Sequence, residues 1–188
     1  MKKRSLRLGS IALAALLAVG SVRDSHSDAA PDTSAPAALA PTDPASSGRL
    51  EGAVTLNRIA AAEVAQPIAQ GKAPAVTPRY DVTNHRLTYR TIDGRGQPIT
   101  ASGLVSVPLN APGAPSPVLA YQHATLFKDA RAPSNHAVAA EAVVVMASLG
   151  YIVVAADYVG YGASRGAPHP YLLAEPSAAA VLDLLTAA

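Results

Sequence analysis

The chain has 188 residues, with 15 basic and 13 acidic side chains, no cysteine and no tryptophan. The lack of cysteine excludes disulfides and thiol chemistry. Four basic residues and no acidic residue precede Gly20, so loss of this segment changes the formal charge from +2 to −2. The positive charge therefore belongs to the N-terminus and does not indicate a nucleic-acid partner.

The N-terminus has the pattern of a secretory signal. Its basic residues lie between positions 2 and 7, and an apolar run from Ile11 to Val19 follows them. This run is shorter than the roughly 20 residues that span a bilayer. We therefore expect a cleaved signal at 1–20, with cleavage as late as residue 30, a secreted or periplasmic location and no stable membrane span; the alternative is an uncleaved membrane anchor. Residues 21–48, rich in Ala, Ser, Asp and Pro, predict a disordered tether.

The segment after the tether predicts a short helix and then a β-hairpin. Residues 56–64 have a helical composition, and Pro67 is expected to end that helix. Residues 85–91 alternate large and polar side chains, as a half-buried strand does, and 99–107 form the returning strand. The Asp-Gly-Arg-Gly sequence at 93–96 is the turn between them.

Two apolar runs, at 117–122 and 151–157, predict buried strands. Between them a helix is expected, with Ser134 or Asn135 as its N-cap and Gly150 as its C-terminal stop. Strand, helix, strand is a βαβ unit, and its two parallel strands end at the same edge of the sheet.

A final helix is expected after the second of these strands. Pro176 suits its first position, and Val181, Leu184 and Leu185 recur at helical spacing, so these three side chains should face the sheet. The predicted fold class is therefore α/β, with an N-terminal β-hairpin, a βαβ unit and a last helix.

Eight short sequence words follow one another along the chain: Tyr89-Arg-Thr, Ala101-Ser-Gly-Leu-Val-Ser-Val-Pro108, Tyr121-Gln-His-Ala-Thr125, Ala132-Pro-Ser134, Gly150-Tyr-Ile-Val-Val-Ala-Ala-Asp-Tyr158, Gly160-Tyr-Gly-Ala-Ser164, His169-Pro-Tyr171 and Ala180-Val-Leu-Asp183. In this order they resemble the N-terminal half of bacterial secreted α/β-hydrolases of the secretory-lipase and esterase type. The resemblance covers residues 80–188. It implies that residues 50–188 are the N-terminal part of an α/β-hydrolase domain, an incomplete sheet truncated before the nucleophile elbow, and that the activity is carboxylic ester hydrolysis. The implied partner is a small-molecule or lipid ester, without a cofactor.

The loop after the first buried strand is where such hydrolases place one oxyanion-hole donor. The resemblance assigns this donor to the backbone of Thr125, with Ala124 as the flanking residue and His123 as a support for the loop. The related proteins commonly have His-Gly where this chain has His123-Ala124. If a positive φ is needed there, Ala124 costs about 1 kcal/mol, or the loop takes another shape.

Gly162-Ala-Ser164-Arg-Gly166 matches the G-x-S-x-G pattern of a nucleophile elbow. An elbow Ser lies on a sharp turn directly between strand and helix. Here the strand ends near Tyr158, six residues earlier, and prolines at 168 and 170 prevent a helix. Ser164 is therefore only the alternative nucleophile, and the elbow Ser, the acid and the base are expected beyond Ala188.

Two further residues have alternative interpretations. Asp157, at the end of its strand, is expected to hold the glycine loop through backbone N–H groups; the alternative is a catalytic acid. His169 is expected to shape a wall of the substrate cleft or a loop; the alternative is a base for Ser164. No His or carboxylate pattern has metal-ligand spacing, so no metal site is expected.

Two other functions compete with ester hydrolysis. The chain could be an inactive fragment or a non-catalytic binding module. A nucleotide-binding domain is disfavoured, because the glycines from Gly160 have the spacing Gly-x-Gly-x-x-x-Gly and no helix opens on them.

Overall fold

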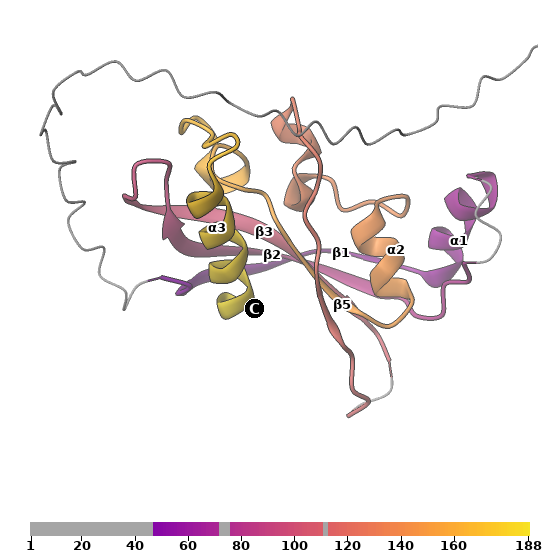
Figure 1. The fold of residues 1–188 in the computed structure, drawn as a ribbon. Coiled ribbons are helices and arrows are strands. Elements are labelled where there is room, and N and C mark those ends of the chain that lie inside the picture. The colour runs from indigo at the N-terminus through magenta and orange to yellow at the C-terminus, as the bar shows by residue number, and fades with distance from the viewer. Residues whose placement is uncertain (1–46, 72–75, 111–112) are drawn as a thin grey trace, which may run out of the picture. The chain divides into compact units, whose positions relative to one another are not determined.

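The computed structural model describes residues 47–71, 76–110 and 113–188. The expected signal at 1–20 and nearly all of the tether at 21–48 lie outside these residues. The described residues form one mixed sheet with helices on both of its faces (Figure 1).

The sheet has five strands in the order β1-β2-β3-β5-β4. β1, β2, β3 and β5 pair antiparallel in succession, whereas β4 pairs with β5 in parallel. β4 therefore lies at one edge of the sheet and β1 at the other. The strands are β1 (Leu50–Ile59), β2 (Val82–Ile92), β3 (Pro98–Pro108), β4 (Val118–Ala120) and β5 (Ile152–Ala156).

The structure corrects the expectation for residues 56–64. The segment from Leu50 to Ile59 is the edge strand β1, and the helix α1 begins later, at Ala61, and ends at Gln70. Most β1 side chains are exposed, so the strand lacks the alternation by which a half-buried strand is recognised. Pro67 lies inside α1 rather than at its end, and the N–H of Ala61 donates to Asp81 Oδ1 at 2.9 Å. Asp81 is distant in sequence, so this contact could not be read locally.

The β-hairpin is confirmed. β2 and β3 pair without a register shift from Val82↔Pro108 to Ile92↔Pro98. In the turn, Asp93 Oδ1 accepts the N–H groups of Arg95 at 2.8 Å and Gln97 at 2.9 Å, which is an Asx-type turn.

The βαβ unit is also confirmed, with β4 and β5 parallel and helix α2 between them. The prediction of a buried strand at 117–122 is wrong, however, because β4 has only three residues and lies mostly exposed at the edge of the described sheet. The helix is shorter than predicted, because α2 spans only Ala142–Ser148. Ser134 and Asn135 lie instead in a separate 3₁₀ turn, η3 (Pro133–Asn135). Their polar groups bond to Arg86 and Asp157 rather than cap a helix.

The last helix, α3 (Ala174–Ala187), packs on the face of the sheet opposite to α2. Alternate β5 residues show this arrangement, because Val153 packs with α2 whereas Val154 packs with Leu184 of α3. Leu184 is fully buried, and Val181 and Leu185 pack partly buried beside it, as predicted. Pro176 is the third helical residue rather than the first.

Candidate active site

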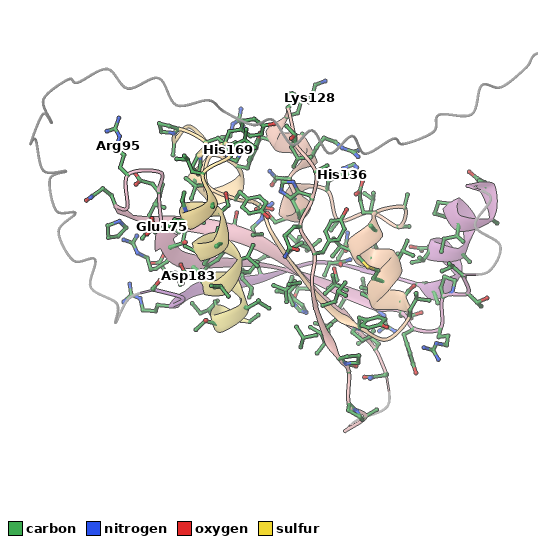
Figure 2. The ribbon with its side chains drawn as sticks, viewed as in Figure 1. Arg95, Lys128, His136, His169, Glu175 and Asp183 are labelled. Carbon is green, nitrogen blue, oxygen red and sulfur yellow. The ribbon has the colours of Figure 1, made fainter. Side chains whose placement is uncertain are left out.

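The loops that follow β4 and β5 lie at the same end of the sheet, because the two strands are parallel neighbours (Figure 1). His136 and His169, which belong to these loops, lie at that end in Figure 2. When the helices that follow two neighbouring parallel strands cover opposite faces of the sheet, a crevice forms at the carboxyl ends of these strands. This crevice is the usual ligand site of an open α/β sheet.

The loop after β4 leaves the sheet at Tyr121, whose N–H still donates to Val154 O at 2.8 Å. His123 Nδ1 donates to the carbonyl oxygen of Ala124 at 2.8 Å. The His123 ring also meets the Tyr158 ring edge-on, with centroids 4.9 Å apart. These contacts join the loop after β4 to the first residue beyond Asp157.

Ala124 and Thr125 present free backbone donors in this loop. Both residues are exposed, and within the described residues neither backbone N–H donates to another group of the chain. Positive φ angles at non-glycine residues occur, in the part of the chain that the structure describes, only at Tyr158 (65°) and Leu172 (62°). The φ angle of Ala124 is therefore not positive, so the loop does not require glycine at this position. Ala124 carries no backbone strain from a left-handed conformation.

The glycine loop follows β5 and includes the 3₁₀ turn η4 (Gly162–Ser164). Gly160 and Gly162 have positive φ angles of 99° and 55°. A Cβ atom at Gly162 would collide with Ser102 Oγ and with Asp157 Oδ2, so only glycine fits there. The loop is thus packed closely onto the end of the sheet.

Asp157 is fully buried below this loop. Its Oδ2 accepts hydrogen bonds from the hydroxyl groups of Ser102 at 2.6 Å and Ser134 at 2.5 Å. Its Oδ1 accepts the backbone N–H of Ser134 at 2.8 Å. Burial raises the pKa of the Asp157 carboxyl, and the bonds from Ser102 and Ser134 and the charge of Arg86 oppose that rise.

Asp157 reaches the glycine loop in a different way from the one predicted. The backbone N–H that it accepts belongs to Ser134, not to the glycine loop. The link to the loop runs through Ser102, whose Oγ accepts the N–H of Ala163 at 2.8 Å. The N–H of Gly162 donates instead to Asp129 Oδ1 at 2.7 Å. Asp157 therefore connects β3, η3 and the glycine loop through one buried carboxylate.

Arg86 completes this arrangement, and no sequence motif pointed to it. Its Nε donates to Ser134 Oγ at 3.0 Å, and its guanidinium also donates to Ser134 O at 2.8 Å. The positive charge of Arg86 is thus separated from the negative charge of Asp157 by a single hydroxyl group. Arg86 and Ser134 lie 48 residues apart in sequence, so only the folded sheet brings them together.

Ser164 has no free hydroxyl. Its side chain is 6% exposed, its Oγ donates to Tyr161 O at 2.9 Å and it accepts the N–H of Gly160 at 3.0 Å. His169 Nδ1 bonds to Val159 O at 2.6 Å rather than to Ser164. Among the described residues, Ser164 has no imidazole partner that would activate it.

His169 lies in the wall of a cavity. This cavity has a volume of about 190 Å³ and lies between the loop after β4 and residues 158–172. Thr125 Oγ1 and the Tyr171 hydroxyl meet across it at 3.2 Å. Their contact joins the loop that carries the free N–H groups to the His-Pro-Tyr segment.

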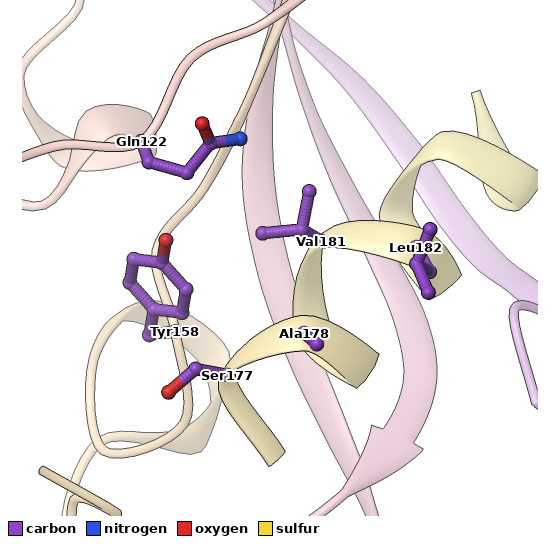
Figure 3. Close-up of a pocket in the computed structure, with 6 residues that line it drawn as sticks. All are labelled: Gln122, Tyr158, Ser177, Ala178, Val181 and Leu182. Atoms are coloured by element: carbon purple, nitrogen blue, oxygen red, sulfur yellow. The ribbon is translucent and has the colours of Figure 1, made fainter. Parts of the chain in front are cut away.

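A wider and more open hollow of about 400 Å³ adjoins this cavity along α3 (Figure 3). Gln122 and Tyr158 lie on one side of it, and Val181 and Leu182 of α3 lie on the other. Tyr158 and Ser177 line both hollows, so the two are neighbours. The wider hollow opens beside β4, which has no further strand next to it in the described sheet.

Two negative findings apply to the described residues alone. They contain no group of three or more His, Cys, Asp or Glu side chains arranged to hold a metal ion. No helix among them has the length and apolar character needed to cross a membrane.

Comparison with solved structures identifies the fold. A candidate hydrolase of Legionella pneumophila aligns with a TM-score of 0.65 and 27% identity, over 74% of this chain and 38% of its own. The rice cell wall degrading esterase LipA of Xanthomonas oryzae aligns with a TM-score of 0.61 and 29% identity, over 75% of this chain and 36% of its own. A ligand-bound form of LipA gives a TM-score of 0.60 and 28% identity, over 75% and 37%.

The chain therefore has a partial α/β-hydrolase fold and is similar to proteins of the esterase type. It spans just over a third of the length of these solved structures. No protein-family profile and no curated protein matches it.

Proposed function

We propose that this chain provides the N-terminal part of an exported carboxylic ester hydrolase, with a signal peptide at 1–20. The observation that carries the proposal is the pair of exposed backbone N–H groups at Ala124 and Thr125, which have no partner among the described residues. They belong to the loop at the carboxyl end of β4, where α/β-hydrolases place an oxyanion-hole donor. In this proposal Thr125 donates to the oxyanion, Ala124 flanks it and His123 supports the loop.

An oxyanion hole works by donating preformed hydrogen bonds to the negative charge that develops on the carbonyl oxygen during attack. Backbone N–H groups suit this role, because the fold fixes them before the substrate arrives. The contacts of His123 with Ala124 O and with the Tyr158 ring fix the loop in this way. The closeness of the chain to an esterase of known structure supports the same reaction class.

We propose further that the attacking Ser is not Ser164 but belongs to a strand outside the 188 residues. The handedness of strand connections supports this position. A right-handed connection through α2 leads from β4 inward to β5. Since α3 covers the opposite face, a right-handed connection through α3 would lead outward, to the free edge of β4. A Ser at the carboxyl end of such a strand would lie beside Ala124 and Thr125.

Covalent labelling tests this proposal. A fluorophosphonate reacts with the activated Ser of a serine hydrolase, and mass spectrometry of the digest identifies the labelled peptide. We expect the polypeptide encoded by the continuing reading frame to be labelled at a G-x-S-x-G Ser beyond residue 188, and the 188-residue chain to remain unlabelled. Labelling at Ser164, or a reading frame that closes without such a motif, would contradict the proposal.

A further inference from the structure

The cavity of about 190 Å³ beside Thr125 has a composition that points to a particular ligand. Its wall contains two imidazole rings, His123 and His169, and three phenol rings, Tyr158, Tyr161 and Tyr171. His169 meets Tyr161 with ring centroids 5.0 Å apart, and Tyr171 at 6.1 Å. A wall of ring faces and edges of this kind favours an aromatic ligand, because offset and edge-on ring pairs attract each other.

The hydrogen bonds of the two imidazoles fix which nitrogen can accept. His123 Nδ1 bonds to Ala124 O, and His169 Nδ1 bonds to Val159 O. A carbonyl oxygen can only accept, so Nδ1 carries the hydrogen in each ring and Nε2 of the neutral ring is an acceptor. His123 Nε2 is buried without a partner among the described residues, so a ligand in the cavity does not reach it. His169 is exposed, and its Nε2 makes no hydrogen bond to the described residues.

The volume of the cavity is sufficient for one ring. A cavity of about 150 Å³ is known to hold one benzene molecule, so about 190 Å³ leaves room for a ring with a small polar group. An aliphatic chain would leave the His169 acceptor without a partner. A ring with a hydroxyl group would satisfy this acceptor and would keep its face against the tyrosines.

We propose that this cavity binds one phenolic ring, whose hydroxyl group donates to Nε2 of His169. If the proposed ester hydrolysis also holds, on which this extension rests, the ring is part of an aryl or hydroxyaryl ester. The ester carbonyl would then lie near the N–H groups of Ala124 and Thr125, since both residues line the same cavity.

Ligand binding tests the inference without any hydrolysis. The probes are 4-methylphenol, 4-methylanisole, which lacks the donor, and methyl glucoside, a ring with hydroxyl groups but no aromatic face. Binding to the full 188-residue chain is titrated by nuclear magnetic resonance at pH 8, where free imidazole is neutral. We expect 4-methylphenol to bind about tenfold more tightly than 4-methylanisole, which is the effect of about one hydrogen bond, and methyl glucoside to bind least.

Variants locate the effect. His169→Phe keeps a ring but removes the acceptor, so it should abolish the preference for 4-methylphenol over 4-methylanisole. Tyr171→Phe, at a side chain that is 54% exposed, should leave the fold intact and weaken both ligands less than His169→Phe weakens 4-methylphenol. The control is His85→Gln, because His85 lies on β2, bonds to Thr55 and does not line the cavity.

Three results would overturn the inference: equal affinity for 4-methylphenol and 4-methylanisole, a preference for the glucoside, or no binding by a chain whose amide spectrum shows it to be folded. A chain that binds 4-methylphenol while the longer polypeptide never hydrolyses esters would contradict the proposed function alone. Hydrolysis without phenol binding would contradict this inference alone.

Discussion

Arg86 and Asp157 are joined through one hydroxyl group. Arg86 Nε donates to Ser134 Oγ at 3.0 Å, and Ser134 Oγ donates to Asp157 Oδ2 at 2.5 Å. Direct burial of an ion pair removes water from both charges at a high cost in free energy. Here the carboxylate is buried while Arg86 remains half-buried, and Ser134 transmits the attraction between them.

Ser134→Ala should therefore destabilise the fold. The substitution removes one donor from a buried carboxylate and one acceptor from Arg86, and an unsatisfied buried group costs about 1–3 kcal/mol. Urea denaturation followed by circular dichroism measures the free energy of unfolding. Ser177→Ala is the matched control, because the Ser177 hydroxyl bonds only to the exposed Leu173 O and its loss should cost about 0.5 kcal/mol or less. Equal losses in the two variants would argue against the bridging role of Ser134.

Because the pKa of Asp157 is raised in the folded state, its contribution to stability should fall as the pH increases. Burial raises this pKa above its ordinary value of 3.8, so the folded state binds the proton more tightly than the unfolded state. The contribution of the carboxyl group to stability is therefore largest below pH 3.8 and falls as the pH rises through the folded-state value. The free energy of unfolding of the wild type minus that of Asp157→Asn should decrease as the pH increases over this range. An increase would contradict the direction of the shift.

Asp81 should show the opposite sign. The N–H of Ala61 and then the side chain of Arg58 lower the pKa of its carboxyl below 3.8. The stability that Asp81 contributes is present above pH 3.8 and is lost as the pH falls through the folded-state value. Asp81→Asn should accordingly reduce the melting temperature at pH 7 and have little effect in strong acid. If the wild type and Asp81→Asn differed equally in melting temperature at both pH values, the contacts of the Asp81 carboxylate with Ala61 and Arg58 would not be the source of the difference.

Alanine substitutions at Gly162 and Gly166 should distinguish the stability cost of a strained backbone from the cost of a steric collision. Both have positive φ, 55° and 96°, but a Cβ atom would strike Ser102 and Asp157 at Gly162 and meet nothing within 4 Å at Gly166. Gly166→Ala should cost about 1 kcal/mol from its backbone conformation alone. Gly162→Ala adds overpacking, which typically costs a further 1–3 kcal/mol. Thermal unfolding of the two variants gives the comparison, and an equal cost would mean that the glycine loop relaxes away from Asp157.

The proposed oxyanion hole can be tested at the backbone N–H of Thr125. Thr125→Pro removes the N–H group, whereas Thr125→Ala keeps it and removes only the hydroxyl. In the longer polypeptide, Thr125→Pro should lower kcat for p-nitrophenyl acetate by about 10²–10³-fold, and Thr125→Ala should have a far smaller effect. Circular dichroism of both variants verifies that the fold survives. A Thr125→Pro variant that is folded and fully active would eliminate this N–H as the donor.

Part of the fold was predictable because its signals are local. The Asp-Gly-Arg-Gly turn at 93–96 and the alternation around it define the β-hairpin, and two apolar runs define the strands around α2. β1 was not predicted because it is an exposed edge strand, and its residues do not alternate between buried and exposed positions. The length of α2 escaped because Arg86 and Asp157 engage Ser134 and Asn135 from distant strands.

The candidate site divides in the same way. Chain order alone placed Ala124 and Thr125 after the first strand of the βαβ unit, and it separated Ser164 from the end of β5. The roles of Ser102 and Arg86 had no signal in the sequence, because each depends on the register of β2 and β3 against β5. Residues that act across a sheet can be identified only after the sheet is known.

Hydrolysis of p-nitrophenyl acetate, measured side by side for the 188-residue chain and for the longer polypeptide of the continuing reading frame, tests the central claim most directly. We predict turnover by the longer polypeptide and none above the uncatalysed rate by the 188-residue chain. Turnover by the 188-residue chain that Ser164→Ala abolishes would contradict the claim that the nucleophile lies on a further strand beside β4.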